Sequence, residues 1–140
     1  VNGDIRLPEI SMYASKVSAI PKVREFLLEL QRNTAKKNNV IMDGRDIGTV
    51  IFPDAEVKIF LFASDEIRAE RRYKELLEKG IQTTYEEVLS DMQKRDENDR
   101  TRAVAPAVPA DDAVMLDSSK LNIEETIDEI TRIIKSKINI

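Results

Sequence analysis

Arginine placement is the clearest chemical signal in this 140-residue sequence. A guanidinium group binds phosphate through paired hydrogen bonds and stays charged at every relevant pH. If one helix runs through Arg95, Asp99 and Arg102, its end offers cations for a phosphate and a carboxylate that can accept from a hydroxyl. The alternative is that these charges form ordinary solvated pairs along helices, as Glu70 and Lys74 would. Seven of the eleven arginines lie in one region: Arg45, Arg68, Arg71, Arg72, Arg95, Arg100 and Arg102.

A loop with the sequence Asp-Gly-Arg-Asp-Ile-Gly, residues 43–48, is a second candidate site. Its glycines would let a ligand approach the backbone closely, while a carboxylate can accept from an amino group and Arg45 can bind an anion. Asp43 would also suit magnesium, bound indirectly through water. The alternative is a turn in which Asp43 and Asp46 cap nearby backbone amides, and the residues alone leave both interpretations open.

The composition restricts the chemistry further, because the sequence contains neither cysteine nor histidine. Within it there is therefore no thiolate nucleophile, no disulfide, no imidazole base and no common zinc site. The 22 basic and 26 acidic residues give a net charge of −4, which argues against binding a nucleic-acid polymer by bulk charge. No apolar run approaches the roughly 18 residues of a membrane span, so we expect no membrane partner and a cytoplasmic location.

Short apolar runs predict the strands that would position these residues. Runs bounded by turn residues are typical of buried parallel strands. Because helical segments separate them, the connections must cross over, which predicts an α/β fold with a parallel sheet. Ligands of such sheets bind beyond the carboxyl ends of the strands. The predicted strands are residues 40–42, 57–62 and 114–116.

Helical spacing and capping residues predict the helices. Pro8 and Pro21 suit first helical positions, and a helix over residues 65–79 would end at Gly80. Two capping boxes open later helices, one formed by Thr84 with Glu87 and one by Asn122 with Glu125; the first of these helices would run to about residue 99. The last helix carries an isoleucine stripe that its spacing assigns to the core: Ile123, Ile127, Ile130 and Ile134.

Several segments resemble motifs of the bacterial cytidylate kinases. Residues 43–55 read DGRDIGTVIFPDA and resemble the family's D-G-R-D-x-G-T-V-V-F-P-x-A signature. Residues 95–106 resemble its lid-to-core segment, residues 14–17 and 21–24 its monophosphate-binding insert, and residues 116–118 with the final helix its C-terminal end. These motifs are long and the resemblance covers essentially the whole chain. It implies a parallel-sheet α/β core of the P-loop nucleoside-monophosphate-kinase type.

The resemblance also implies an activity, its ligands and its residues. Members of this family transfer the γ-phosphoryl group of ATP to CMP or dCMP, giving CDP or dCDP, and Mg²⁺ accompanies the ATP. The implied catalytic group consists of arginines: Arg71, Arg72, Arg95 and Arg102. The implied substrate contacts are those to cytosine by Ser15, Arg24 and Asp46, to the phosphate by Arg45 and Arg102, and to the sugar by Arg95 and Asp99.

Glycine usage is where the sequence departs from the family pattern. None of Gly3, Gly44, Gly48 and Gly80 begins the G-x-x-x-x-G-K loop that cradles ATP phosphates, so no residue here is predicted to bind ATP. We therefore expect the C-terminal portion of a cytidylate kinase, incomplete at its N-terminus and by itself inactive or nearly so. Residues 1–39 would be part of the monophosphate-binding insert with the following helix. Residues 40–140 would be the core, with a lid segment at about 68–102.

The base preference follows from hydrogen-bonding groups. Cytosine offers an amino donor and the N3 acceptor, and uracil reverses both, so Asp46 and Arg24 would fit cytosine and be left unpaired against uracil. Other functions stay open: a kinase for another monophosphate such as UMP, a nucleotide-binding piece without transfer, or a helical interaction protein. We expect the parent enzyme to be a monomer, while an exposed sheet edge could let the shorter chain self-associate.

Overall fold

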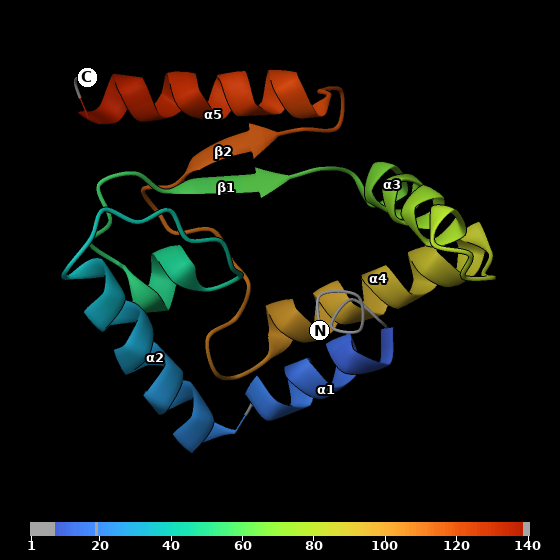
Figure 1. The fold of residues 1–140 in the computed structure, drawn as a ribbon, viewed down its shortest axis with the longest axis horizontal. Coiled ribbons are helices and arrows are strands. Elements are labelled where there is room, and N and C mark those ends of the chain that lie inside the picture. The colour runs from blue at the N-terminus through green and yellow to red at the C-terminus, as the bar shows by residue number, and fades with distance from the viewer. Residues whose placement is uncertain (1–7, 19, 139–140) are drawn as a thin grey trace. The chain divides into compact units, whose positions relative to one another are not determined.

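The computed structural model describes residues 8–18 and 20–138 (Figure 1). The chain divides into two compact units, Val1–Asp43 and Gly44–Ile140. In the first unit, α1 spans Pro8–Ser18 and α2 spans Pro21–Ala35, so both helix starts predicted from proline are confirmed. Proline suits these positions because the first helical residues have no intrahelical acceptor for an N–H group.

The predicted strand at residues 40–42 is wrong. These residues form no regular element, and Ile41 is 94% exposed. A strand needs a neighbouring strand to satisfy its backbone groups, and the two strands that the structure describes pair with each other instead. A run of three apolar residues indicated burial here, but burial depends on what lies beside the run.

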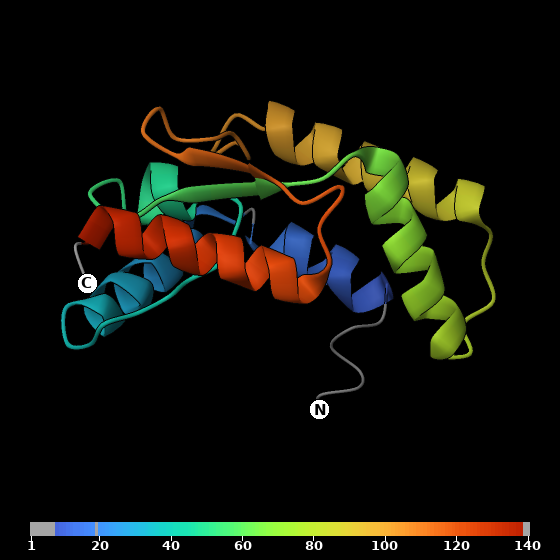
Figure 2. The same cartoon turned by 90° about the horizontal axis from the view of Figure 1, so that it is seen from above.

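A parallel pair of strands forms the sheet of the second unit, as predicted (Figures 1 and 2). β1, Ile59–Phe62, pairs with β2, Val114–Asp117, in a register that places Leu61 opposite Leu116. The backbone bond from Ser118 N to Phe62 O, 2.8 Å long, extends the ladder past the strand ends. The carboxyl ends of both strands therefore lie at the same edge, from which the chain continues into the next helices.

α3, Asp65–Glu78, and α4, Tyr85–Thr101, form a helical hairpin after β1. Buried Ala69, Leu76 and Val88 hold its two helices together. Tyr73 and Tyr85 pack against this cluster, with their rings edge to face with each other. Its predicted signals are confirmed: Gly80 ends the first helix with a φ of 73°, and the capping box at residues 84–87 is complete. α4 runs slightly past the predicted end at residue 99.

α5, Ile123–Ile138, runs along the sheet formed by β1 and β2 in both views (Figures 1 and 2). Its predicted capping box is confirmed by reciprocal bonds of 2.8 and 2.9 Å between Asn122 and Glu125. The isoleucine stripe is only partly core, because Ile123 and Ile127 are exposed and Ile133, outside the predicted stripe, is buried. The two described strands form a surface too narrow to cover the whole apolar face of the helix. No helix in the described part of the chain combines the length and apolar character needed to cross a bilayer.

Candidate functional site

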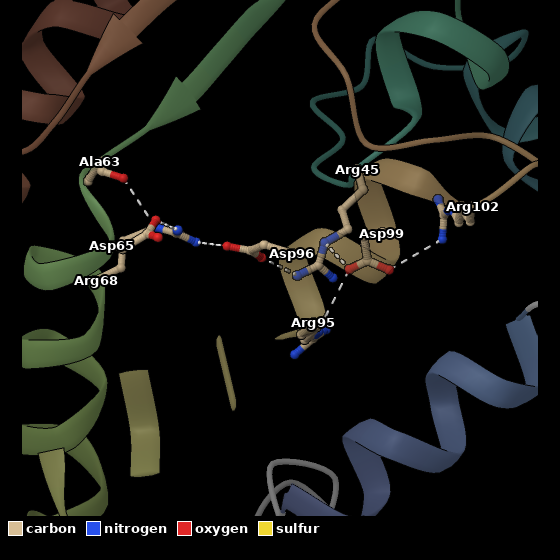
Figure 3. A network of polar contacts seen from close by, with 8 residues as sticks. All are labelled: Arg45, Ala63, Asp65, Arg68, Arg95, Asp96, Asp99 and Arg102. Carbon is tan, nitrogen blue, oxygen red and sulfur yellow. Dashed lines mark hydrogen bonds and ion pairs between the residues drawn. The ribbon is translucent and has the colours of Figure 1, made fainter. Parts of the chain in front are cut away.

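Three arginines converge on the buried carboxylate of Asp99, near the C-terminal end of α4 (Figure 3). Arg45 Nε lies 2.8 Å from Asp99 Oδ2, and Arg95 Nε lies 3.9 Å from the same oxygen. Arg102 Nη1 lies 3.6 Å from Oδ1. The structure thus brings together four residues that the sequence predicted for one site, from segments far apart in the chain.

The carboxylate of Asp99 keeps unused hydrogen-bonding capacity. Its Oδ2 is buried, and no group in the described residues donates a hydrogen bond to it, because the close approach of Arg45 Nε is an ion pair without hydrogen-bond geometry. A buried carboxylate oxygen that lacks a donor is costly unless a partner supplies one. A hydroxyl group of a ligand would be such a partner.

The segment after α4 folds back to hold Asp99 and Arg102. Ala107 N donates to Asp99 O over 2.8 Å, and Arg102 Nε donates to Ala105 O over 2.5 Å. Ala105 is buried with a φ of 51°, a left-handed conformation that is strained for a residue other than glycine. Arg102 lies just beyond the helix in extended backbone, yet these bonds keep its guanidinium beside α4.

Arg45 is positioned by the loop that precedes a short π-helix, η2, Ile47–Ile51, which the sequence analysis did not predict. The carbonyl of Asp46, rather than its side chain, accepts from the N–H of Val50 at 2.9 Å and from the hydroxyl of Thr49 at 3.4 Å. The Asp46 side chain is half-buried. π-Helical turns are rare and are frequent at functional sites.

The side chain of Lys58 lies against the segment that follows Arg45. Its side chain is only 8% exposed, and its ammonium group binds both oxygens of Asp112 at 2.8 Å and also the Pro53 carbonyl. A Cβ atom added at Gly48 would lie 3.4 Å from Lys58 Cδ. This distance is an ordinary van der Waals contact, so the structure does not require glycine at position 48.

A second ion-pair group, which sequence reasoning missed, borders the first. Asp96 Oδ2 lies 2.5 Å from Arg68 Nη1, and Asp96 Oδ1 lies 3.8 Å from Arg45 Nη2. Asp65 accepts from Arg68 at 2.5 Å and from Gln93 at 3.2 Å. Of these contacts, only the pair of Asp65 and Arg68 could have been predicted from the sequence, because the two residues are three positions apart on one helix. The other pairs join residues of different elements.

Burial and neighbouring charges shift the pKa values of two arginines in this region, Arg95 and Arg68. Burial lowers the pKa of Arg95 and the neighbouring Arg45 guanidinium lowers it further, against an opposing effect of Asp99. Asp96 acts with Asp99 to raise the pKa of Arg95, and the positive charge of Arg72 acts with Arg45 to lower it. Burial also acts to lower the pKa of Arg68, but its bonds to Asp96 and other carboxylate contacts outweigh burial and raise it. Burial is therefore the main cause of the lowered pKa of Arg95.

The remaining predicted residues lie elsewhere or engage other groups. Arg71 Nη2 donates to the carbonyls of Ser118 and Leu121, at 2.7 and 3.1 Å, and would have to leave both to reach a phosphate. Arg72 pairs with Glu75 at 2.8 Å. Ordinary surface pairing, the alternative interpretation, is confirmed for Glu70 with Lys74 at 2.7 Å, and Arg100 with Glu97 is a further example.

The first unit holds the other predicted base contacts. Arg24 on α2 is half-buried, and its Nη1 donates to Ser18 O over 3.4 Å. Ser15 lies on α1, but its side chain falls outside the described residues. Asp43 is exposed, and within the described ranges no group of three acidic side chains could hold a metal ion.

The fold and the site define a class of protein. The Arg68 group begins at the carboxyl end of β1 and continues into a cluster of arginines, as in parallel α/β proteins that bind ligands beyond their strand ends. The protein-family model described as cytidylate kinase matches residues 1–136. The chain therefore belongs to the cytidylate kinase family.

Individual relatives agree with this assignment. The chain is 52% identical over 137 residues to a cytidylate kinase of Thermosipho melanesiensis. The matching region covers 98% of this chain and 63% of that relative. It is 53% identical to a cytidylate kinase of Carboxydothermus hydrogenoformans and 51% identical to that of Klebsiella pneumoniae, covering 95% and 99% of this chain and 60% and 61% of these relatives. The chain thus spans about three fifths of the length of the curated relatives that it matches.

Proposed function

We propose that this chain supplies the monophosphate-acceptor site of a cytidylate kinase, which transfers the γ-phosphoryl group of ATP to CMP or dCMP. The observation that carries the proposal is the convergence of Arg45, Arg95 and Arg102 on the single buried carboxylate of Asp99. With the adjoining Arg68, Asp65 and Asp96 included, four positive charges against three negative charges leave an excess of one. Such an excess favours the phosphate of a nucleotide, which carries close to two negative charges.

The same cluster offers a contact for the sugar. Asp99 Oδ2 is buried without a hydrogen-bond donor from the described residues, so a sugar hydroxyl could donate to it. Arg95 has a half-exposed side chain on the same helix, one turn before Asp99. We therefore propose that Arg45 and Arg102 bind the acceptor phosphate, and that Arg95 and Asp99 contact the sugar.

Base recognition is proposed for Asp46, which follows Arg45 directly. Its carboxylate can accept from the amino group of cytosine, whereas uracil would present a carbonyl oxygen at that place and leave both groups unpaired. The cytosine contacts of Ser15 and Arg24 in the first unit remain a prediction from the sequence. Localisation in the cytoplasm and the absence of a polymer or membrane partner likewise remain predictions.

Catalysis in such an enzyme needs positioned charge more than covalent help. Phosphoryl transfer proceeds with little covalent chemistry from the protein, and positive groups stabilise the charge on the transferred phosphoryl. Arg72, Arg95 and Arg102 remain the proposed catalytic arginines, and Arg71 joins them only if it releases its two carbonyls. Mg²⁺ would accompany ATP. The described residues contain no group of three acidic side chains that could hold a metal ion directly. A contact of exposed Asp43 with Mg²⁺ through water remains a prediction from the sequence, and we assign no residue here to ATP.

Calorimetric titration of the chain with CMP, UMP and ATP, each alone, tests this proposal. We expect CMP to bind at least tenfold more tightly than UMP, and the variant Asp46→Asn to lose most of this preference. Asp54→Asn is the matched control, because Asp54 is an exposed aspartate eight residues further along the same segment. Equal binding of CMP and UMP that Asp46→Asn leaves unchanged would favour another monophosphate acceptor. No binding of any monophosphate would refute the proposal.

Turnover separates the enzyme from the second candidate, a nucleotide-binding piece. CMP binding without ATP binding, and without CDP formation from CMP and ATP, would favour the binding piece. That result would leave the assignment of the acceptor site intact, because the arginine cluster would bind CMP both in a kinase and in a nucleotide-binding piece.

A further inference from the structure

The carboxylate of Asp96 connects two groups of arginines (Figure 3). Its Oδ2 lies 2.5 Å from Arg68 Nη1, and its Oδ1 lies 3.8 Å from Arg45 Nη2. Asp96 and Asp99 are three residues apart on α4 and so share one face of the helix. Asp96 therefore faces the arginine cluster without being the carboxylate on which that cluster converges.

Arg68 anchors Asp96 to the sheet. Arg68 Nε donates to Ala63 O at the end of β1 over 3.1 Å, and Nη2 binds Asp65 at 2.5 Å. The side chains of Arg68 and Asp96 are about one third exposed. The guanidinium of Arg68 is thus held on three sides, and it fixes the position of Asp96 relative to the end of β1.

Two carboxylates hold two edges of the Arg45 guanidinium. Asp99 lies against Nε at 2.8 Å and Asp96 against Nη2 at 3.8 Å, whereas Nη1 has no ion-pair or hydrogen-bond partner in the described part of the chain. The guanidinium group is planar, so contacts at two of its nitrogens define its orientation. The contact at Nε is an ion pair without hydrogen-bond geometry, so by itself it does not fix the plane of the guanidinium.

We propose that Asp96 is a positioning residue for Arg45 in the acceptor-phosphate site. This inference rests on the proposed function, because it assigns Arg45 to the phosphate. Asp96 orients the guanidinium so that Nη1 and the outer side of Nη2 present their N–H groups to the phosphate. It acts through Arg45 and is not assigned a contact with the nucleotide.

A positioning role and a purely electrostatic role predict effects of opposite sign. Asp96 carries a negative charge beside a site for an anion, so removing that charge without any other change would strengthen CMP binding. If Asp96 orients Arg45, removing the charge frees the guanidinium, and binding must then order a long side chain. The positioning role therefore predicts weaker CMP binding on neutralisation, against the charge effect.

Titration of CMP and of cytidine into the wild-type chain, Asp96→Asn and Glu97→Gln tests the proposal. Glu97 is the matched control, because it is the next residue on α4 and pairs with exposed Arg100 instead. We expect Asp96→Asn to weaken CMP binding about five- to tenfold, which corresponds to ordering one long side chain. Cytidine binding should change by less than twofold, because cytidine lacks the phosphate. Glu97→Gln should leave both unchanged.

Two results would overturn the proposal in these titrations. CMP binding that is unchanged or tighter in Asp96→Asn would show that orientation of Arg45 does not depend on Asp96. Equal weakening of CMP and cytidine would show a general structural effect on the hairpin. Arg68→Lys, which keeps the charge but loses the planar fork, serves as a second variant and should weaken CMP binding in the same direction by a smaller factor.

A measurement without ligand keeps this proposal separate from the proposed function. The Nε–Hε signal of Arg45 in ¹⁵N NMR spectra, assigned by its absence in Arg45→Lys, should shift and broaden in Asp96→Asn and stay unchanged in Glu97→Gln. If the wild-type chain binds no CMP, the proposed function fails, while the Arg45 signal still tests the positioning role. An Arg45 signal identical in the wild type and Asp96→Asn would overturn that role.

Discussion

Neutralising Asp99 is the sharpest test of the arginine cluster as a structural unit. The variant Asp99→Asn keeps the size of the side chain and removes the one negative charge on which Arg45, Arg95 and Arg102 converge. Asp96 still lies 3.8 Å from Arg45, but the three guanidinium groups then repel one another with less compensation. We therefore expect the variant to fold but to be less stable than the wild type.

The magnitude follows from the burial of the partners. The Asp99 side chain is 9% exposed, but those of Arg45, Arg95 and Arg102 are 39, 52 and 29% exposed, so solvent screens each pair. Pairs of this kind contribute about 0.2–1 kcal/mol each, and removing one partner of a buried pair costs more than the pair contributes. We expect a loss of about 2 kcal/mol in the free energy of unfolding, or about 8 °C in the thermal midpoint.

Thermal unfolding followed by circular dichroism measures this loss, with Asp91→Asn as the control. Asp91 is exposed on the same helix, two turns before Asp99, so its neutralisation should change the midpoint by less than about 2 °C. Raising the salt concentration should narrow the difference between the wild type and Asp99→Asn, because salt screens the partly exposed pairs. A variant as stable as the wild type, or more stable, would refute the view that the arginines stabilise this buried carboxylate.

Three further predictions concern the elements around the site. Arg71→Ala should lower the free energy of unfolding by about 2 kcal/mol, because the carbonyls of Ser118 and Leu121 lose the donor that Arg71 supplies. CMP titration should show unchanged affinity, whereas weaker CMP binding at unchanged stability would support a catalytic Arg71. Gly80→Ala should cost about 1 kcal/mol in thermal unfolding through its φ of 73° alone, since nothing lies within 4 Å of the added Cβ, and an unchanged midpoint would contradict this. Hydrogen bonds from two basic neighbours lower the pKa of Glu75 from 4.5 to about 2, so its stabilisation is present above about pH 4.5 and is lost as the pH falls toward 2. Glu75→Gln should flatten that part of a curve of thermal midpoint against pH, and a curve of unchanged shape would count against the pairing.

Local signals in the sequence determined where the helices begin and end. Proline at helix starts, Gly80 and the capping boxes at Thr84 and Asn122 act over three or four residues, and the structure has each of them where the sequence predicted. The family assignment likewise follows from contiguous motifs, and the comparisons confirm it. Such features are legible in a sequence because their causes lie within one helical turn.

Tertiary structure alone decided which side chains meet. Arg45 reaches Asp99 and Asp96 on a helix far along the chain, and the guanidinium of Arg71, predicted to lie over phosphates, is bound to the loop after β2 instead. The strand expected at residues 40–42 and the fully buried stripe expected on α5 failed for the same reason. An apolar run or a charge specifies what a residue can bind or bury against, but the neighbouring elements determine whether such a partner is present.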